Sequence, residues 1–213
     1  MPYLFTRQLR LAPGNLLDSM TWSAKITEKV NEISEVPVSL WSTVFSPKLG
    51  TLSWTVVVDE WSQLETLDAK LLADSGYTAL ADEGARYGSD AGIDDALVNL
   101  IHSDPDAATG DRQYAGVVQA VLAPGHAAKG IELGVEIAQR AKKITGRPTS
   151  FGALQTGVYG AIEWIVLYDS VDQAQKADEA LASDKGFAEL LDKEASKAYL
   201  AGLSTQTMHR RVI

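Results

Sequence analysis

Histidine is scarce in this sequence, so its few positions are the first candidates for proton transfer. The chain has three histidines, and the ordinary pKa of this side chain lies close enough to neutral to suit a general acid or base. His102 and His209 end two similar stretches, "NLIH" and "QTMH". We predict them as candidate catalytic residues; the alternative is a pair of half-exposed strand-end histidines without a chemical role. His126 follows Pro-Gly at an expected helix start and is interpreted as incidental.

A carboxylate stands in the middle of an apolar stretch, "AIEWIVLYD", which is rich in strand-forming residues. If this residue, Glu163, is buried, the loss of hydration raises its pKa and makes it a candidate base. If it points to solvent, it has no such meaning. We predict Glu163 as a third candidate catalytic residue.

Two glutamines and two tryptophans are the candidate substrate-binding residues. Trp54 and Trp164 stand in the middle of expected strands. Tryptophans line ligand pockets, but a tryptophan that fills the core is the alternative. Gln8 and Gln119 fall in the middle of two other expected strands. A buried glutamine needs a partner or a ligand, whereas a solvent-facing one needs neither.

The sequence lacks the motifs of the common cofactor and metal sites. It has no glycine-rich phosphate loop, nucleophile elbow or zinc-binding helix. The acidic stretches at 90–95 and 104–111 lack the ligand spacing and the final glutamate of a calcium loop. There is no cysteine, which excludes disulfides, thiolate ligands and a cysteine nucleophile, and which fits a reducing cytoplasm. We therefore expect no metal and no cofactor.

An internal repeat positions these candidates. The letters Leu-Ala-Pro-Gly occur at 11–14 and again at 122–125, 111 residues later. The same offset aligns Gln8 with Gln119, and after one deletion an offset of 110 aligns Trp54 with Trp164. At that second offset Glu163 meets Ser53, so the two copies differ there. Many matches in chain order with one deletion predict a tandem duplication.

Each copy has the pattern of a β-α-β-β-α-β unit. Apolar residues alternate in the expected strands and recur at helical spacing in the expected helices. We predict a first repeat at 1–103, a linker at 104–112 and a second repeat at 113–213. The stretches "GARYGSDAGIDD" and "DPDAATGD" are interpreted as exposed loops. The expected strands are 3–11, 38–46, 51–59, 96–103, 149–156, 161–169 and 203–212, besides the one around Gln119, and the expected helices are 15–35, 62–84, 125–145 and 170–197.

Composition limits the possible partners. Hydrophobic residues make up 46% and charged residues 22% of the chain, as in ordinary globular proteins. A formal charge of −9 argues against nucleic acid or an anionic membrane surface as the main partner. The N-terminal stretch lacks the features of a secretory signal, and no run of 18 apolar residues predicts a membrane span. We expect a cytoplasmic protein that binds a small molecule.

This order of elements resembles the ferredoxin-like fold. Two such units in one chain resemble the dimeric α+β barrel superfamily in its fused, pseudo-dimeric form. The resemblance implies an α+β fold in which two four-stranded antiparallel sheets pack face to face with helices outside. It also implies that a single chain, as a monomeric pseudo-dimer, is the minimal unit. The superfamily includes antibiotic-biosynthesis-type monooxygenases, haem-degrading enzymes, chlorite-dismutase-like proteins and lactone isomerases.

The sequence differs from the haem-degrading branch of this superfamily, which reduces the number of activities that the resemblance implies. The haem-degrading branch combines a first-strand asparagine with a tryptophan and a histidine on the second helix. Here the first-strand residue is glutamine, and neither 62–84 nor 170–197 contains histidine. The resemblance then implies a cofactor-independent monooxygenase or isomerase, with an apolar cavity between sheet and helices for a planar aromatic or polyketide-like substrate. The alternative is a non-enzymatic ligand-binding or assembly module with the two tryptophans in its core.

Overall fold

The computed structural model describes residues 1–14, 16–108 and 112–213. Over these residues it has the dimeric α+β barrel fold, with antiparallel strands in the closed order β1-β3-β2-β8-β5-β7-β6-β4. The chain divides into two compact units, residues 1–97 with 211–213 and residues 98–210, and each unit is described by itself below. No helix formed by the described residues has both the length and the apolar character that a membrane crossing requires.

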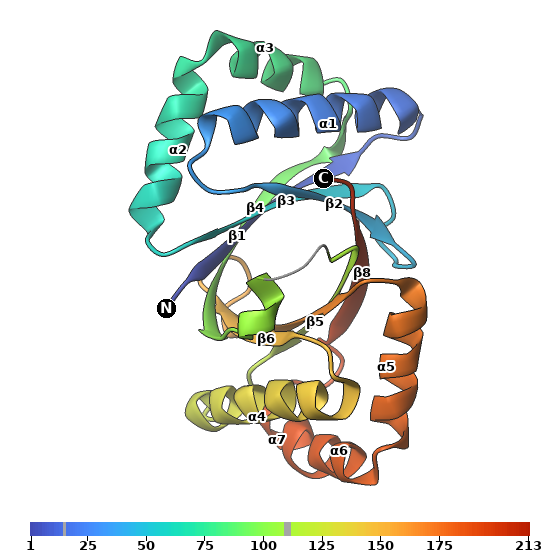
Figure 1. Cartoon of the computed structure of the whole chain (residues 1–213). Helices are drawn as coiled ribbons and strands as arrows, with labels where there is room; N and C mark the ends of the chain where they lie inside the picture. The colour runs from blue at the N-terminus through green and yellow to red at the C-terminus, as the bar shows by residue number, and fades with distance from the viewer. Residues whose placement is uncertain (15, 109–111) are drawn as a thin grey trace. The chain divides into compact units, whose positions relative to one another are not determined.

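The first unit is a β-α-β-β-α-β arrangement with its helices on one face of the sheet. Figure 1 shows α1, α2 and α3 on one side of the strands β1 to β3. The expected second helix is broken at Asp74, whose side chain accepts a hydrogen bond from the backbone N–H of Tyr77 and so starts a new helix. The elements are β1 (Tyr3–Leu11), α1 (Leu16–Ile33), β2 (Ser39–Val44), β3 (Thr51–Val58), α2 (Trp61–Ala73), α3 (Ser75–Gly84) and β4 (Gly88–His102), whose last residues belong to the second unit.

The register of β1 and β3 decides which residues face the helices. Arg7 lies opposite Trp54, and Gln8 lies opposite Ser53. Trp54 points to the helices, because its indole N–H donates to Thr27 of α1 at 2.8 Å. Successive strand residues point to opposite faces of a sheet. Gln8 and Ser53 therefore lie on the face opposite the helices, which we call the helix-free face.

The second unit repeats this plan. Its strand order is β8-β5-β7-β6, and β5 pairs with β7 so that Val118 lies opposite Trp164 and Gln119 lies opposite Glu163. Figure 1 shows α4 and α5 against this sheet and α6 and α7 beside α4. The elements are η1 (Pro105–Ala108), β5 (Tyr114–Val121), α4 (Ala127–Thr145), β6 (Thr149–Leu154), β7 (Ala161–Tyr168), α5 (Val171–Ser183), α6 (Lys185–Leu190), a π-helical turn (Leu191–Ala195), α7 (Ser196–Ala198) and β8 (Thr205–Arg211).

The repeated Leu-Ala-Pro-Gly stretch makes the same turn in both units. The N–H of Leu11 donates to the carbonyl oxygen of Gly50 at 2.8 Å, and the N–H of Leu122 donates to that of Gly160 at 2.9 Å. Gly14 and Gly125 then take φ values of 96° and 79°, a region that residues with a Cβ rarely occupy. The motif therefore ends the first strand and directs the chain toward the first helix of each unit. The duplication that would explain it stays a prediction.

The interpretation of "GARYGSDAGIDD" as an exposed loop was wrong. The strand β4 begins at Gly88, well before the expected start at residue 96, and includes most of this stretch. Glycine and aspartate are poor strand formers, but Arg7 of β1 donates two hydrogen bonds of 2.8 Å to Asp95. This partly exposed ion pair joins the strand to β1 and contributes at most about 1 kcal/mol. Of the expected linker, residues 105–108 form a 3₁₀ turn and residues 109–111 lie outside the described residues.

Close packing of α4 on its sheet gives a first prediction. A Cβ at Gly134 would lie 2.1 Å from the ring of Phe151, which is fully buried. We expect Gly134→Ala to destabilise the fold by about 1–2 kcal/mol, because overpacking outweighs the gain in helix propensity. Chemical denaturation measures this.

Gly186→Ala is the matched control. Its Cβ would clash with the guanidinium end of Arg140, a flexible and partly exposed side chain that is free to move, and would lie at ordinary contact distance, 3.4 Å, from the carboxylate of Asp184. Equal stability of the two variants would contradict the proposed packing constraint.

Candidate functional site

A buried carboxyl lies on the helix-free face of the second unit. Glu163 is 6% exposed, and its Oε2 accepts a hydrogen bond of 2.9 Å from Nε2 of Gln119. Burial raises the pKa of Glu163 above its ordinary value, and the hydrogen bond from Gln119 offsets only part of that rise. The geometry thus holds a carboxyl group that can take up a proton under conditions where a surface glutamate stays ionised.

The corresponding position of the first unit holds a hydroxyl. Gln8 lies opposite Ser53 as Gln119 lies opposite Glu163. Ser53 is 3% exposed, and its Oγ has no hydrogen-bond partner among the described residues. The two units therefore share a glutamine on their helix-free faces and differ in the group that faces it.

Gln8 also lines a cavity of about 210 Å³. This volume is below the range of about 300–1,000 Å³ that is usual for drug-sized ligands, so the cavity suits a small molecule. Two cations, one carboxylate, one amide and one hydroxyl contribute to its wall. The lining residues are Gln8, Arg10, Lys48, Thr51, Ala91 and Asp94, all in the first unit.

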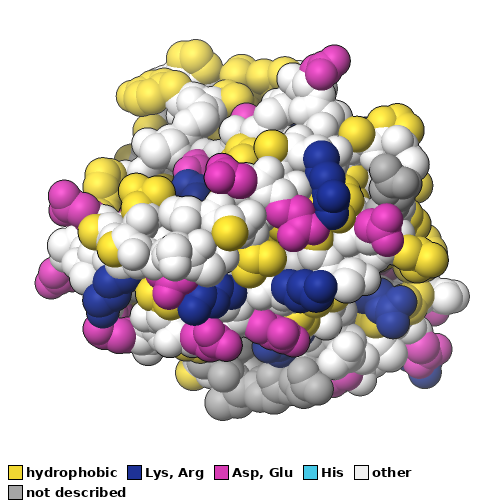
Figure 2. Space-filling model, turned by 90° about the horizontal axis from the view of Figure 1, so that it is seen from above, with side chains coloured by type: hydrophobic (Ala, Val, Ile, Leu, Met, Phe, Trp, Pro, Cys, Tyr) yellow, Lys and Arg dark blue, Asp and Glu magenta, His cyan; other side chains and the backbone are white. Residues whose placement is uncertain are grey.

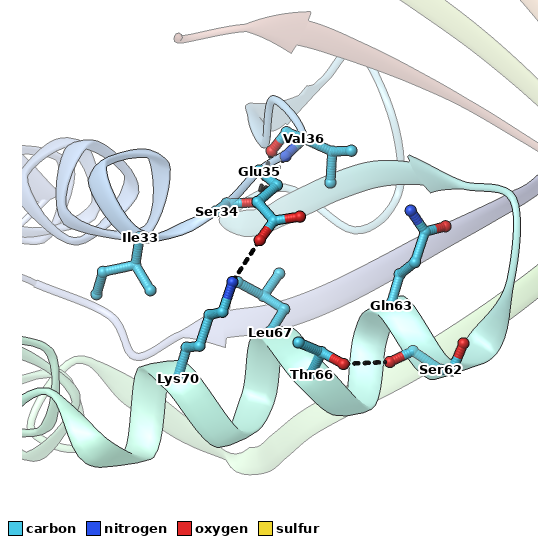
Figure 3. A pocket seen from close by; sticks show the side chains of 9 residues that line it. All are labelled: Ile33, Ser34, Glu35, Val36, Ser62, Gln63, Thr66, Leu67 and Lys70. Carbon is cyan, nitrogen blue, oxygen red and sulfur yellow. Dashed lines mark hydrogen bonds and ion pairs between the residues drawn. The ribbon is translucent and has the colours of Figure 1, made fainter.

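A second cavity, of about 150 Å³, is a groove between the end of α1 and the helix α2. An ion pair of 2.5 Å between Lys70 and Glu35 spans this groove, as Figure 3 shows. The ammonium of Lys70 lowers the pKa of Glu35. Because its two charged groups already satisfy each other, this groove offers less to a polar ligand than the cavity beside Gln8.

The structure places Trp54 and Trp164 on the helix-covered faces. The indole N–H of Trp164 donates to the carbonyl oxygen of Gly134 at 2.8 Å, and Trp54 lies edge-on to Trp22 with ring centroids 6.0 Å apart. Neither tryptophan lines either of the two cavities described above. Their role in substrate binding stays a prediction, while their packing into the core of each unit is observed.

The structure does not bring the two histidines together. His209 lies on β8 opposite Ala115, and His102 lies on β4 opposite Phe151 of β6. The strands β5, β7 and β6 separate β8 from β4 in this unit. Glu163 pairs with Gln119, which lies four residues after Ala115 on β5. The distance between Glu163 and His209 along the strands is therefore about 13 Å.

Burial changes the acid-base properties of His209. Its Nε2 lies 3.0 Å from Oγ1 of Thr207, and its Nδ1 is buried without a partner among the described residues. Loss of hydration lowers the pKa of His209 to about 4. His209 is therefore neutral at physiological pH. Its role in proton transfer stays a prediction, as does that of His102, which is half-buried.

Sequence reasoning missed the charged residues of the first cavity. The register aligns Arg10 and Thr51 of the first unit with Val121 and Ala161 of the second. A difference between the copies, charged and polar in one and apolar in the other, was the available signal. Glu163 differs from its counterpart Ser53 in being a carboxyl, and the sequence analysis notes that difference.

Charged side chains are mixed on the face of the molecule that Figure 2 shows. Basic and acidic groups lie interspersed there, and the basic ones do not gather into a single patch. Mixed charges screen each other and give little attraction for a polyanion.

Comparison with known proteins supports the fold. No protein-family model matches the sequence, and no curated protein sequence matches it significantly. A candidate monooxygenase from Fusobacterium nucleatum superposes with a TM-score of 0.72 at 9% identity, over 100% of this chain and 93% of its own. A candidate monooxygenase from Lactobacillus acidophilus gives 0.67 at 10% identity, over 99% and 93%. An anthrone oxidase-like protein gives 0.67 at 10% identity, over 100% and 92%. At such low identity the likeness shows the fold alone.

The buried histidine predicts a pH dependence of stability. The pKa of His209 is about 4 in the folded chain against an ordinary 6.5, so the unfolded state binds the proton more tightly. The contribution of His209 to the free energy of unfolding is complete above pH 6.5 and decreases as the pH falls toward 4. The loss between pH 7 and pH 5 is about 2 kcal/mol.

We expect His209→Gln to remove this component of the acid sensitivity, as measured by urea unfolding at both pH values. Titration of the His209 ring by NMR measures the pKa directly. His102→Gln serves as the matched control. An apparent pKa near 6.5 for His209 would contradict the burial seen in the structure.

Proposed function

We propose that the protein is a cofactor-independent monooxygenase acting on a small planar aromatic or polyketide-like substrate, with Glu163 as the base that removes a proton from it. The observation that carries the proposal is the buried carboxyl of Glu163, held by Gln119 on one unit only. The fold is shared with structures described as a candidate monooxygenase and as anthrone oxidase-like, which supports the reaction class.

The reaction needs a base and dioxygen. Ionised Glu163 takes a proton from an acidic methylene carbon of the substrate, and the carbanion that forms is stabilised by the adjoining aromatic ring. The carbanion transfers electrons to dioxygen, and a carbon–oxygen bond forms to give a peroxide. Loss of water from the peroxide leaves a ketone. Overall the methylene group and dioxygen give a carbonyl group and water, and the proton returns from Glu163 to the departing oxygen.

The surroundings of Glu163 suit this role. A carboxyl with a raised pKa is a stronger base when ionised than a surface carboxylate. The Gln119 amide orients the carboxyl, and it could instead donate to the oxygen of a substrate enolate. In an isomerase the same base would return the proton to a different carbon, and no dioxygen would be consumed. Gln119 belongs to this proposed site. Substrate binding by Gln8, Trp54 and Trp164 and proton transfer by His102 or His209 stay separate predictions, because both tryptophans point to the helix-covered faces and Gln8 belongs to the first unit.

The proposal predicts the effect of a single-atom change at Glu163. We expect Glu163→Gln to lower the rate of dioxygen uptake with an anthrone substrate by about 10²- to 10⁴-fold, because an amide cannot accept the proton. An oxygen electrode, with product identified by mass spectrometry, measures this. Glu189→Gln removes an exposed carboxylate of the same unit, which pairs with Lys193, and should leave the rate unchanged.

Unaltered dioxygen uptake in Glu163→Gln would exclude this residue as the base. No uptake by the wild-type protein with anthrones or quinols would favour the alternative, a non-enzymatic ligand-binding or assembly module. The packing of both tryptophans into the cores favours that alternative. In either case we propose that one chain is the minimal unit, which light scattering in solution tests.

The raised pKa also predicts an effect on stability. The folded state holds the proton of Glu163 more tightly than the unfolded state does, so the stabilisation is full below the unfolded pKa and is lost as pH rises through the folded value. Glu163→Gln keeps a neutral group of the same shape at every pH. We expect its melting temperature relative to wild type to be higher at pH 8 than at pH 4. A constant difference between the two proteins would show that Glu163 is not desolvated.

A further inference from the structure

We infer that the cavity beside Gln8 in the first unit is a binding site for a small monocarboxylate that also carries a hydrogen-bond donor, such as a hydroxy acid. This inference is independent of the proposed oxygenase function, since Glu163 takes no part in it. It stands on the charges that line the cavity and on their lack of partners.

The strands β1 and β4 divide their charges between the two faces of the sheet. Arg7 forms two hydrogen bonds with Asp95, on the face that carries Trp54. Arg10 lies three residues after Arg7, and Asp94 lies one residue before Asp95. Because successive strand residues alternate between the two faces, Arg10 and Asp94 point to the helix-free face. Both line the cavity.

The charges of the cavity do not satisfy one another. Arg10 and Asp94 line the same space, yet no ion pair within 4.0 Å joins them, and none joins Lys48 to Asp94. Among the described residues Gln8 likewise has no side-chain hydrogen bond. An ion pair would be the natural state of opposite charges that could reach each other, so the space between them is available to a ligand with complementary groups.

Gln8, which lines the cavity, faces a buried polar atom that does not itself line it. Ser53 lies opposite Gln8, is 3% exposed, and has an unpartnered Oγ. An unsatisfied buried hydroxyl costs free energy unless a ligand or water supplies the missing bond.

The fold does not require these groups. Arg10 pairs in register with Thr51, and the corresponding pair in the second unit is Val121 with Ala161. The same strand positions are therefore apolar in one unit and polar in the other. A structural role common to both sheets would not produce this difference.

The arrangement of charge selects the ligand. Arg10 and Lys48 together attract an anion, and a guanidinium binds a carboxylate through two parallel hydrogen bonds. Asp94 disfavours a second negative charge, which argues for a monoanion over a dianion such as phosphate. Asp94 and Gln8 also accept hydrogen bonds, which accounts for a hydroxyl or similar donor on the ligand. The volume of about 210 Å³ limits it to a small molecule.

Isothermal titration calorimetry of the full chain with para-hydroxybenzoate tests the inference. The isosteric neutral compound para-hydroxybenzamide is the ligand control. We expect the acid to bind at least tenfold more tightly than the amide, and Arg10→Gln to weaken binding of the acid at least tenfold. Arg10→Lys should retain part of the affinity. Lys185→Gln removes an exposed charge of the second unit and should leave binding unchanged.

Three outcomes would overturn the inference: equal binding of acid and amide, no binding of either, or binding of the acid that Arg10→Gln leaves intact. The last would place the acid elsewhere, including the proposed oxygenase site. If Arg10→Gln fails to fold, Lys48→Gln replaces it, because Lys48 is exposed on the hairpin after β2.

Asp94→Asn should raise the affinity for inorganic phosphate, and an unchanged phosphate affinity would remove Asp94 from the site. These titrations measure binding and consume no dioxygen. Their result therefore tests the carboxylate site separately from the oxygenase function, which the dioxygen-uptake assay tests.

Discussion

The two-residue period of the strands is the constraint on which the rest of this structure depends. In both units it separates one face that is largely apolar, because helices cover it, from another that is free to carry polar groups. Trp54 and Trp164 mark the first face, and Gln8 and Gln119 mark the second. A shift of the strand register by one residue would move each set of side chains to the opposite face. A tryptophan that packs against the helices therefore places the glutamine or other polar residue next to it on the helix-free face. Packing on one face thus decides which strand positions reach the helix-free face, but not which residues occupy them.

Each tryptophan fixes this register by a hydrogen bond to a helix as well as by the volume of its ring. Each indole N–H reaches the first helix of its unit, at Thr27 in α1 and at the carbonyl oxygen of Gly134 in α4. Neither partner is a charged group, and both anchors are internal to a unit. The second anchor requires glycine, because Gly134 also makes room for the ring of Phe151. A hydrogen bond and a close approach at the same residue hold the helix at one position on the sheet.

Most of the fold could be predicted from the sequence, because alternation, helical spacing and the Pro-Gly turns all point to the same order of elements. The strand β4 is the exception: Gly88 to Asp95 carries no apolar alternation, and the partner of its Asp95 is Arg7, 88 positions away in the sequence. The site was only partly predictable. The glutamines and Glu163 stood out by their positions in strands, but which face they occupy depends on register. The cavity beside Arg10 joins β1, β3 and β4 with the hairpin at Lys48, and no local pattern indicates that these four segments meet. The division into repeats at 1–103 and 113–213 stays a prediction.

The difference between the two units is the strongest indication of function that the chain contains. Where packing dictates the residue, the units agree, as at the two tryptophans and at the turns after the first strands. Where packing does not dictate it, they differ: Ser53 against Glu163, Arg10 against Val121, and Thr51 against Ala161. The first unit carries a polar residue at all three positions, and the second unit carries one only at Glu163. Ser53, Thr51 and Glu163 are buried, and the hydroxyl of Ser53 has no partner among the described residues. Buried polar groups weaken a fold unless something compensates for them. At the positions of Arg10 and Thr51 the second unit shows that apolar residues are compatible with the same sheet. Stability alone would favour such residues there, so the polar pair of the first unit is better explained by a ligand.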